Sequence, residues 1–244
     1  MSMEWIAGSV FFLFVGLLSW FTMKKYQDIL KYQAWLSSFG AGFIIALIFT
    51  HMLPEVYHHL GMKGGLWVIG GFVIQTLLEP LSKGIEHGHI HVHKREFPTT
   101  IIIGLLLHAF LESLPLFTGH SHHGHEGHEV NHNLVLGILL HKVPITIVLV
   151  SLLMRSEVAK GKMVVTLFLF ALTMPVGAAV GALLNNAQWF TSDVFIGVIN
   201  GLVVGILLHI STTIVFEQDQ SHSFNLNKFI GIGLGIALAL ITIL

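Results

Sequence analysis

The stretch from Val194 to Phe216 reads VFIGVINGLVVGILLHISTTIVF and contains no Asp, Glu, Lys or Arg. A helix of about 20 apolar residues spans the hydrocarbon core of a bilayer, so this stretch predicts a transmembrane helix. Similar stretches recur along the chain, and together they predict an all-α membrane protein with eight transmembrane helices in a single domain, residues 1–244. The predicted helices cover residues 4–22, 33–53, 64–82, 98–118, 134–154, 163–184, 194–216 and 228–244.

The composition of the chain also indicates a lipid environment. Hydrophobic residues make up 54% of the sequence and charged residues only 10%, whereas soluble domains carry roughly 25% charged residues. A net charge of −1 gives no indication of nucleic-acid binding. Cysteine is absent, which excludes disulfides and thiolate metal sites, but histidine occurs 17 times against 12 Lys and Arg.

The basic residues between the predicted helices indicate the orientation of the chain. Loops on the cytoplasmic side of a membrane are enriched in Lys and Arg. Only Lys63 falls on one side of the predicted helices, and Lys142 lies within a helix. The sequence therefore predicts a multi-pass protein of the cell membrane with both termini outside. The other basic residues share the predicted cytoplasmic side: Lys24, Lys25, Lys31, Lys83, Lys94, Arg95, Arg155, Lys160, Lys162 and Lys228.

Two histidine-rich segments interrupt the apolar pattern. One lies in a predicted cytoplasmic loop, residues 83–97, and the other in a predicted external loop, residues 119–133. Imidazole nitrogens are largely neutral near pH 7 and are common metal ligands. We expect both loops to collect or sense metal ions.

Ionisable side chains inside predicted spans form a candidate metal site. His108 and Glu112 are four residues apart and therefore share one face of a helix. His141 lies at a similar depth in the next helix, which runs in the opposite direction. Such residues cost about 2.5–3.5 kcal/mol each on membrane insertion and persist where they pair or bind something. Two imidazoles and a carboxylate suit Zn²⁺ and similar divalent ions such as Fe²⁺.

Lys142 follows His141 directly and lies close to the predicted depth of Glu112. A buried lysine without a partner is neutral or destabilising, so we expect it to pair with Glu112. Pro115 and Pro144 follow the two halves of the site, and proline frees a backbone carbonyl and kinks a helix. Inside a membrane such breaks occur where neighbouring groups or cavity water satisfy the freed backbone.

Further ligands are expected on either side of the central site. His51 and Glu55 lie near the predicted outer end of one helix, and His209 and Glu217 near the inner end of another. This disposition is expected if the helices form a 3+2+3 inverted-repeat bundle, with the first three and last three helices related across the central pair. Solvated charges at helix ends would explain Glu55 and Glu217 equally well.

These features resemble the ZIP family of divalent metal transporters over nearly the whole chain. The family's motif His-Asn-x-x-Glu-Gly is similar to His108–Ser113, and its next motif is similar to His141–Ile145. The resemblance implies import of zinc, and in some members iron, manganese or cadmium, into the cytoplasm. It also implies a movement of helix groups and, in many members, a homodimer.

This sequence departs from the family pattern where a second adjacent metal is held. Ala109 stands in place of Asn, Lys142 in place of an acid or Asn, and Ile145 in place of Glu. We hypothesise that the ammonium group of Lys142 replaces the second cation and leaves one metal among His108, Glu112 and His141.

The sequence leaves three functions open. The first is a divalent metal transporter that imports zinc, iron or manganese and is not an enzyme; its metal is cargo, and no resident cofactor is expected. The second is an intramembrane zinc-dependent hydrolase, which needs an open metal position for an activated water. The third is a transport-inactive metal sensor. Ligands on both sides of the central site favour the transporter.

Overall fold

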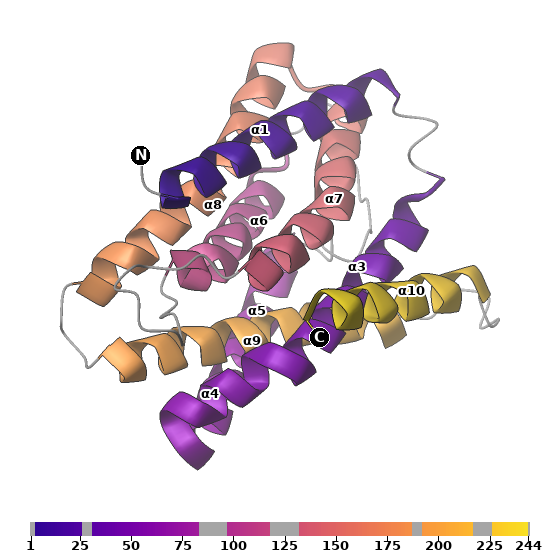
Figure 1. Cartoon of the computed structure of the whole chain (residues 1–244). Coiled ribbons are helices and arrows are strands. Elements are labelled where there is room, and N and C mark those ends of the chain that lie inside the picture. Colours follow the sequence, from indigo (N-terminus) through magenta and orange to yellow (C-terminus); the bar gives the residue numbers. More distant parts are fainter. Residues whose placement is uncertain are drawn as a thin grey trace.

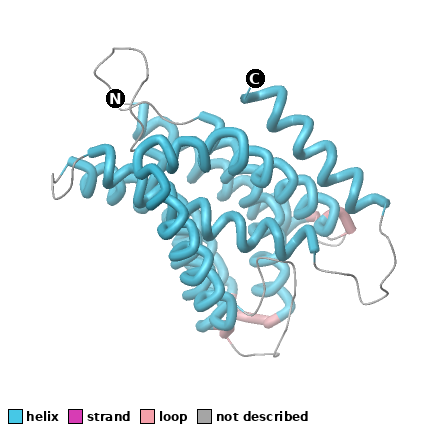
Figure 2. The backbone as a smooth tube through the Cα atoms, turned by 90° about the horizontal axis from the view of Figure 1, so that it is seen from below, coloured by secondary structure: helices cyan, strands magenta, loops and turns pink. Residues whose placement is uncertain are grey.

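The computed structural model is built from helices (Figure 1), and it describes residues 3–25, 31–82, 97–117, 132–186, 192–216 and 226–243. No strand occurs within these ranges (Figure 2), so the predicted all-α class is confirmed for them. Residues 83–96 and 119–131 of the two histidine-rich loops, and Glu217, lie outside the described residues. The main helices are α1 (Met3–Lys24), α3 (Gln33–Leu47), α4 (Leu53–Leu60), α5 (Gly64–Ser82), α6 (Thr99–Ser113), α7 (His132–Arg155), α8 (Lys160–Asn186), α9 (Ser192–Phe216) and α10 (Leu226–Ile243).

Five helical stretches in the described residues are long and apolar enough to cross a membrane. The first of them contains two predicted spans, because the chain stays helical through the turn between them. Shorter apolar helices cover Phe12–Lys24 and Leu226–Thr242. The presence of membrane-spanning helices is thus supported, whereas the number of eight and the inverted repeat stay predictions. The five stretches are Gln33–Leu81, Thr99–Leu116, Val135–Arg155, Lys160–Asn185 and Asp193–Phe216.

A widened turn separates α3 from α4. Residues Ile48–Met52 form a π-helix, η1, directly before α4, which has Pro54 in its first turn. Proline has no N–H for the helical hydrogen-bond ladder, and a π turn accommodates such a break. The hydroxyl of Thr50 donates to the carbonyl of Ala46 at 2.7 Å within this region. The 3-10 turn η2 (Gly61–Lys63) then reverses the chain into α5.

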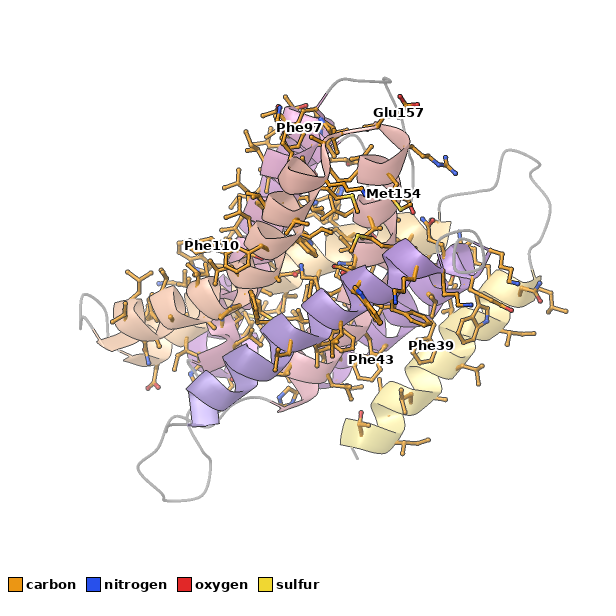
Figure 3. The ribbon with its side chains drawn as sticks, turned by 90° about the horizontal axis from the view of Figure 1, so that it is seen from above. Phe39, Phe43, Phe97, Phe110, Met154 and Glu157 are labelled. Carbon is orange, nitrogen blue, oxygen red and sulfur yellow. The ribbon has the colours of Figure 1, made fainter. Side chains whose placement is uncertain are left out.

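Three helix pairs run parallel and pack backbone to backbone through glycine. Gly71 of α5 faces the backbone of Leu202 in α9, and Gly181 of α8 faces the backbone of Leu114 at the end of α6. In the third pair, Gly235 of α10 faces the backbone of Phe39 in α3, and Figure 3 shows Phe39 and Phe43 beside α10. Small residues let helices approach closely in a membrane, where packing replaces the hydrophobic effect as the force for association.

The pairs assemble into two groups of helices. Helices α3, α4, α5, α9 and α10 pack mainly on one another, and α1 packs on α7 and α8 beside α6 (Figure 1). The groups meet where α3 contacts α7 and where α5 contacts α6. Gly40 of α3 faces the backbone of Leu140 and His141 at this boundary. The central polar residues of the sequence therefore lie beside the contact between the two groups.

Candidate metal centre

Helix α6 contributes two buried donors to the centre. The side chains of His108 and Glu112 are both 0% exposed, and His108 Nε2 lies 3.0 Å from Glu112 Oε2. Their spacing of four residues places them one turn apart on one helix face. Helix α6 ends at Ser113, and the 3-10 turn η4 (Leu114–Phe117) follows around Pro115. The predicted break at this proline is therefore present, directly after the acid.

Helix α7 contributes His141 and Lys142, which are each 1% exposed. The ring of His141 meets that of His108 edge to face, with centroids 5.9 Å apart. The ammonium nitrogen of Lys142 contacts Glu112 Oε1, so the predicted ion pair is present. Helix α7 continues through Pro144, which has no N–H to offer the carbonyl of Leu140.

The four polar side chains occupy the space between α6 and α7. Helix α6 packs mainly on α8 and α5, and α7 packs mainly on α3 and α1. The two helices are therefore held chiefly by other neighbours, and the contacts between them include that of His108 with His141 and that of Glu112 with Lys142. Ligands on separately supported helices can close on an ion and open again without unfolding either helix.

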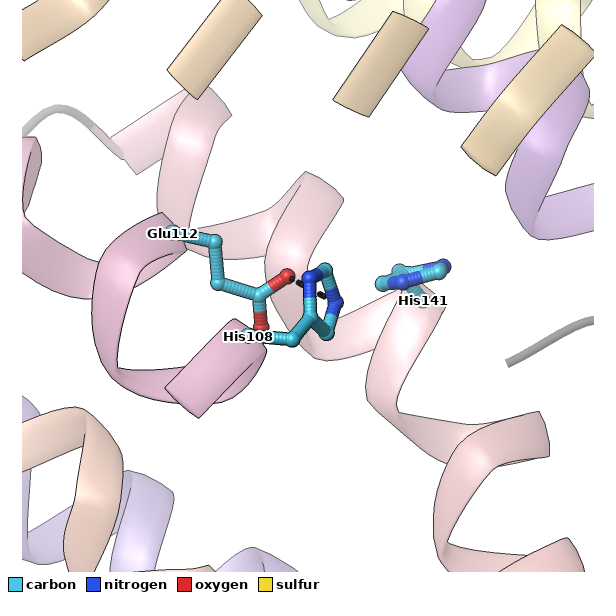
Figure 4. Close-up of side chains that lie close together, drawn as sticks. All are labelled: His108, Glu112 and His141. Carbon is cyan, nitrogen blue, oxygen red and sulfur yellow. Dashed lines mark ion pairs between the residues drawn. The ribbon is translucent and has the colours of Figure 1, made fainter. Parts of the chain in front are cut away.

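The donor atoms are close enough for one ion. One ligand atom each from His108, Glu112 and His141 lies within 4.8 Å of the others, and all three residues are buried (Figure 4). Zinc ligands lie about 2.0–2.2 Å from the metal, so a small contraction would place all three on one Zn²⁺. The structure thus brings together the three residues predicted for the central site.

The predicted outer ligands come from a different part of the chain, η1 and α4. His51 lies in the π-helix η1 and Glu55 one turn later in α4, and both are partly exposed. In the described part of the chain, the group of three or more residues able to share a metal is the central one alone. His51 and Glu55 are therefore not among the ligands that the structure groups at the centre, and their place on an outer path stays a prediction.

The predicted inner ligand His209 has a partner that sequence reasoning missed. His209 Nε2 lies 3.0 Å from Glu79 Oε2 of α5, and Nδ1 lies 3.4 Å from the hydroxyl of Thr76. The ring of Phe72 packs edge-on against the same imidazole, with centroids 4.7 Å apart. An acid in the last turn of an otherwise apolar helix was a signal that could have identified Glu79. Glu217, which was predicted together with His209 for the inner path, lies outside the described residues.

Fold and site together describe a protein of apolar, membrane-spanning helices with a buried His–Glu–His group that could hold a metal ion. The model of the ZIP zinc transporter family matches residues 98–242, more than half of the chain. The chain therefore belongs to the ZIP zinc transporter family. Members of this family are transporters, which agrees with the expectation that the protein is not an enzyme.

A relative with a curated description is protein zntD of Dictyostelium discoideum. The two sequences are 23% identical over 157 residues, which cover 59% of this chain and 22% of the relative. The chain thus spans about a fifth of the length of this relative.

Proposed function

We propose that this protein carries a divalent metal ion, preferentially Zn²⁺, across the cell membrane into the cytoplasm. The observation that carries the proposal is the buried donor set of His108, Glu112 and His141, within 4.8 Å of one another in a chain of apolar helices. Membership of the ZIP family supports transport over hydrolysis or sensing. In this role the metal is the substrate of the protein.

The proposed route has one further metal-binding site on each side of the central site. Metal passes His51 and Glu55 on entry and His209 on exit, where Glu79 supplies a second donor 3.0 Å from the imidazole. Glu217 remains part of the proposed exit. His51, Glu55 and Glu79 are partly exposed, which favours rapid exchange, because a binding site on the route must release the ion as readily as it binds it.

Binding of the metal would replace the direct contact between Glu112 and His108 by bonds from both residues to the ion. The carboxylate oxygen Oε2 of Glu112 now faces His108 Nε2 at 3.0 Å, and a metal between these atoms would accept electron pairs from both. Since His108 and His141 come from different helices, a relative shift of α6 and α7 would break the ligand set and release the ion. No ATP is needed, because two charges moving across 100 mV release about 5 kcal/mol.

The ligand set also predicts a ranking among metals. Nitrogen and oxygen ligands bind divalent ions in the order Mn²⁺ below Fe²⁺, with Zn²⁺ above both. In competition for uptake, we expect unlabelled Zn²⁺ to inhibit most, Fe²⁺ less and Mn²⁺ least. Strongest inhibition by Mn²⁺ would contradict the proposed preference.

The proposed partners of the protein are the lipids of the membrane and a second copy of the chain. Large apolar side chains such as Leu66 and Ile69 of α5 and Phe168 of α8 are exposed, as expected for surfaces that meet lipid tails. The basic residues support termini on the outside. The resemblance to the family supports a homodimer.

The test is uptake of radiolabelled Zn²⁺ into proteoliposomes that contain the purified protein. We expect wild type to accumulate label, and His108→Ala and Glu112→Ala each to abolish uptake by removing a ligand. His58→Ala is the matched control, since it removes an exposed histidine at the end of α4, and should keep uptake. Unchanged uptake in both ligand variants would refute the assignment of the site.

A further inference from the structure

Glu112 and Lys142 are charged residues that are buried inside the protein. Among the residues whose burial the structure describes, no other buried residue is an Asp, Glu, Lys or Arg. They come from different helices, and the ammonium nitrogen of Lys142 contacts Glu112 Oε1 directly. Without an ion, the formal charge of these two side chains therefore sums to zero. An acid alone at this depth would leave a net negative charge.

That difference matters for a carrier when it has released its cargo. A carrier must return to the loading side with an empty site, and moving an uncompensated buried charge through a low-dielectric barrier is strongly unfavourable. A site with a bare carboxylate returns readily only when another cation occupies it. Such a protein exchanges metal for metal and accumulates little.

We propose that Lys142 is a tethered counter-cation that neutralises Glu112 in the empty site, so that the unloaded carrier returns without a second ion. This inference rests on the proposed transport function and specifies its mode, which is net uptake and not obligatory exchange. Lys142 acts through Glu112 and is a positioning residue, not a ligand of the metal.

Lys142 and His108 contact different oxygens of the Glu112 carboxylate. Glu112 presents Oε1 to Lys142 and Oε2 to His108, so a metal at Oε2 does not require the lysine to leave. The ammonium nitrogen also lies 5.4 Å from the ring centroid of Phe170, a buried residue of α8. An aromatic face attracts a cation within about 6 Å, which gives the ammonium a second partner as the metal approaches.

The net charge of the site differs between the loaded inward step and the empty return step. The empty site crosses with no net charge, and the site loaded with a divalent ion crosses with two positive charges. A membrane potential, negative inside, therefore drives the loaded inward step and leaves the return unaffected. Replacing Lys142 by a neutral residue leaves one negative charge on the returning site, which that same potential drives outward but the barrier opposes.

The experiment compares ⁶⁵Zn²⁺ uptake into zinc-free proteoliposomes with uptake into proteoliposomes preloaded with unlabelled Zn²⁺. The ratio of preloaded to zinc-free initial rates measures how far the empty return limits the cycle. For wild type we expect a ratio near one at every imposed potential. For Lys142→Met we expect the ratio to rise by about tenfold or more, since the bare carboxylate then needs a returning cation.

Two further variants define what the ratio reports. Lys142→Arg keeps the charge and should return the ratio toward the wild-type value. Lys160→Met removes an exposed lysine at the start of α8 and should leave the ratio near one. A purely structural role of Lys142 would lower both rates in parallel and leave the ratio unchanged.

The outcomes distinguish this inference from the function on which it rests. Absence of uptake by wild type under both conditions would overturn the proposed function. Transport by wild type with a ratio well above one would overturn the role of Lys142 alone, even if Lys142→Met fails to fold. An unchanged ratio in a folded, transporting Lys142→Met protein would overturn it as well.

Discussion

At the scale of single residues, the carboxylate of Glu112 organises the centre. One of its oxygens contacts Lys142, and the other lies 3.0 Å from His108. A buried ion pair has an uncertain net effect on stability, but removal of one partner leaves the other charge buried alone. The stability of the helix bundle and the chemistry of the site are therefore coupled through one side chain.

Removal of either charge alone should destabilise the protein more than removal of both. Glu112→Gln and Lys142→Met should each lower the free energy of unfolding by about 3–5 kcal/mol, and the double variant should recover much of that loss. Thermal unfolding in detergent without metal measures the three variants against wild type. A double variant as unstable as the sum of the singles would show that the two side chains act independently.

The central site should hold one metal and not two. The ammonium group of Lys142 contacts Glu112 Oε1, and our hypothesis is that it replaces a second cation there, since like charges a few ångströms apart repel strongly at low dielectric. Wild type should therefore bind one more Zn²⁺ per chain than Glu112→Ala, as measured by elemental analysis after dialysis. Two adjacent anomalous-scattering peaks at this depth would contradict the replacement of the second metal by lysine.

At the scale of elements, glycine sets how closely the helices approach. The Cβ of an alanine at position 181 of α8 would collide with the backbone of Leu114, just beyond Glu112. Helix α8 therefore packs against the end of α6 and holds it in place, although α8 carries no predicted ligand. The pairs α5–α9 and α3–α10 rely on glycine in the same way.

Gly181→Ala should impair the site without changing any ligand. We expect a loss of about 1–3 kcal/mol in the free energy of unfolding, because overpacking shifts the backbone, and a reduced rate of zinc uptake. Gly161→Ala is the control in the same helix, since its Cβ meets nothing within 4 Å. Equal stability and uptake in the two variants would show that the contact at Gly181 yields without effect.

At the scale of the whole molecule, the ends of the helices determine which residues share a side. Figure 3 shows Phe97, which precedes α6, and Glu157, which follows α7, at the same end of the molecule. Lys162 near the start of α8 lies 5.6 Å from the ring centroid of Phe97. Lys162, one of the basic residues predicted to be cytoplasmic, thus lies at the end of the molecule that carries Phe97 and Glu157.

The absence of native cysteine makes the orientation directly measurable. Single cysteines can replace Met62, which is 89% exposed between α4 and α5, and Glu157, which is exposed after α7. A membrane-impermeant maleimide should label Met62→Cys on intact cells, and Glu157→Cys only after permeabilisation. The reverse pattern would place the termini inside and invert the proposed direction of entry.

Much of the architecture follows from local sequence. Within the described residues, the predicted helices fall mainly on helical residues, because runs of apolar residues must satisfy their backbone hydrogen bonds internally in lipid. The second predicted helix extends to Leu60 through a π turn, since the break at Pro54 is absorbed without ending the helix. Spacing also sufficed for His108 and Glu112, because four residues along a helix fix a shared face.

Tertiary structure alone decided which helices became neighbours. Glu79 and His209 are 130 positions apart, and no local pattern relates them; the parallel packing of α5 on α9 brings them together. The distribution of helices into two groups likewise depends on glycine contacts between distant segments. Hydropathy and helical period act over a few turns and therefore specify spans and shared faces, whereas packing between helices depends on the whole set of side chains at once.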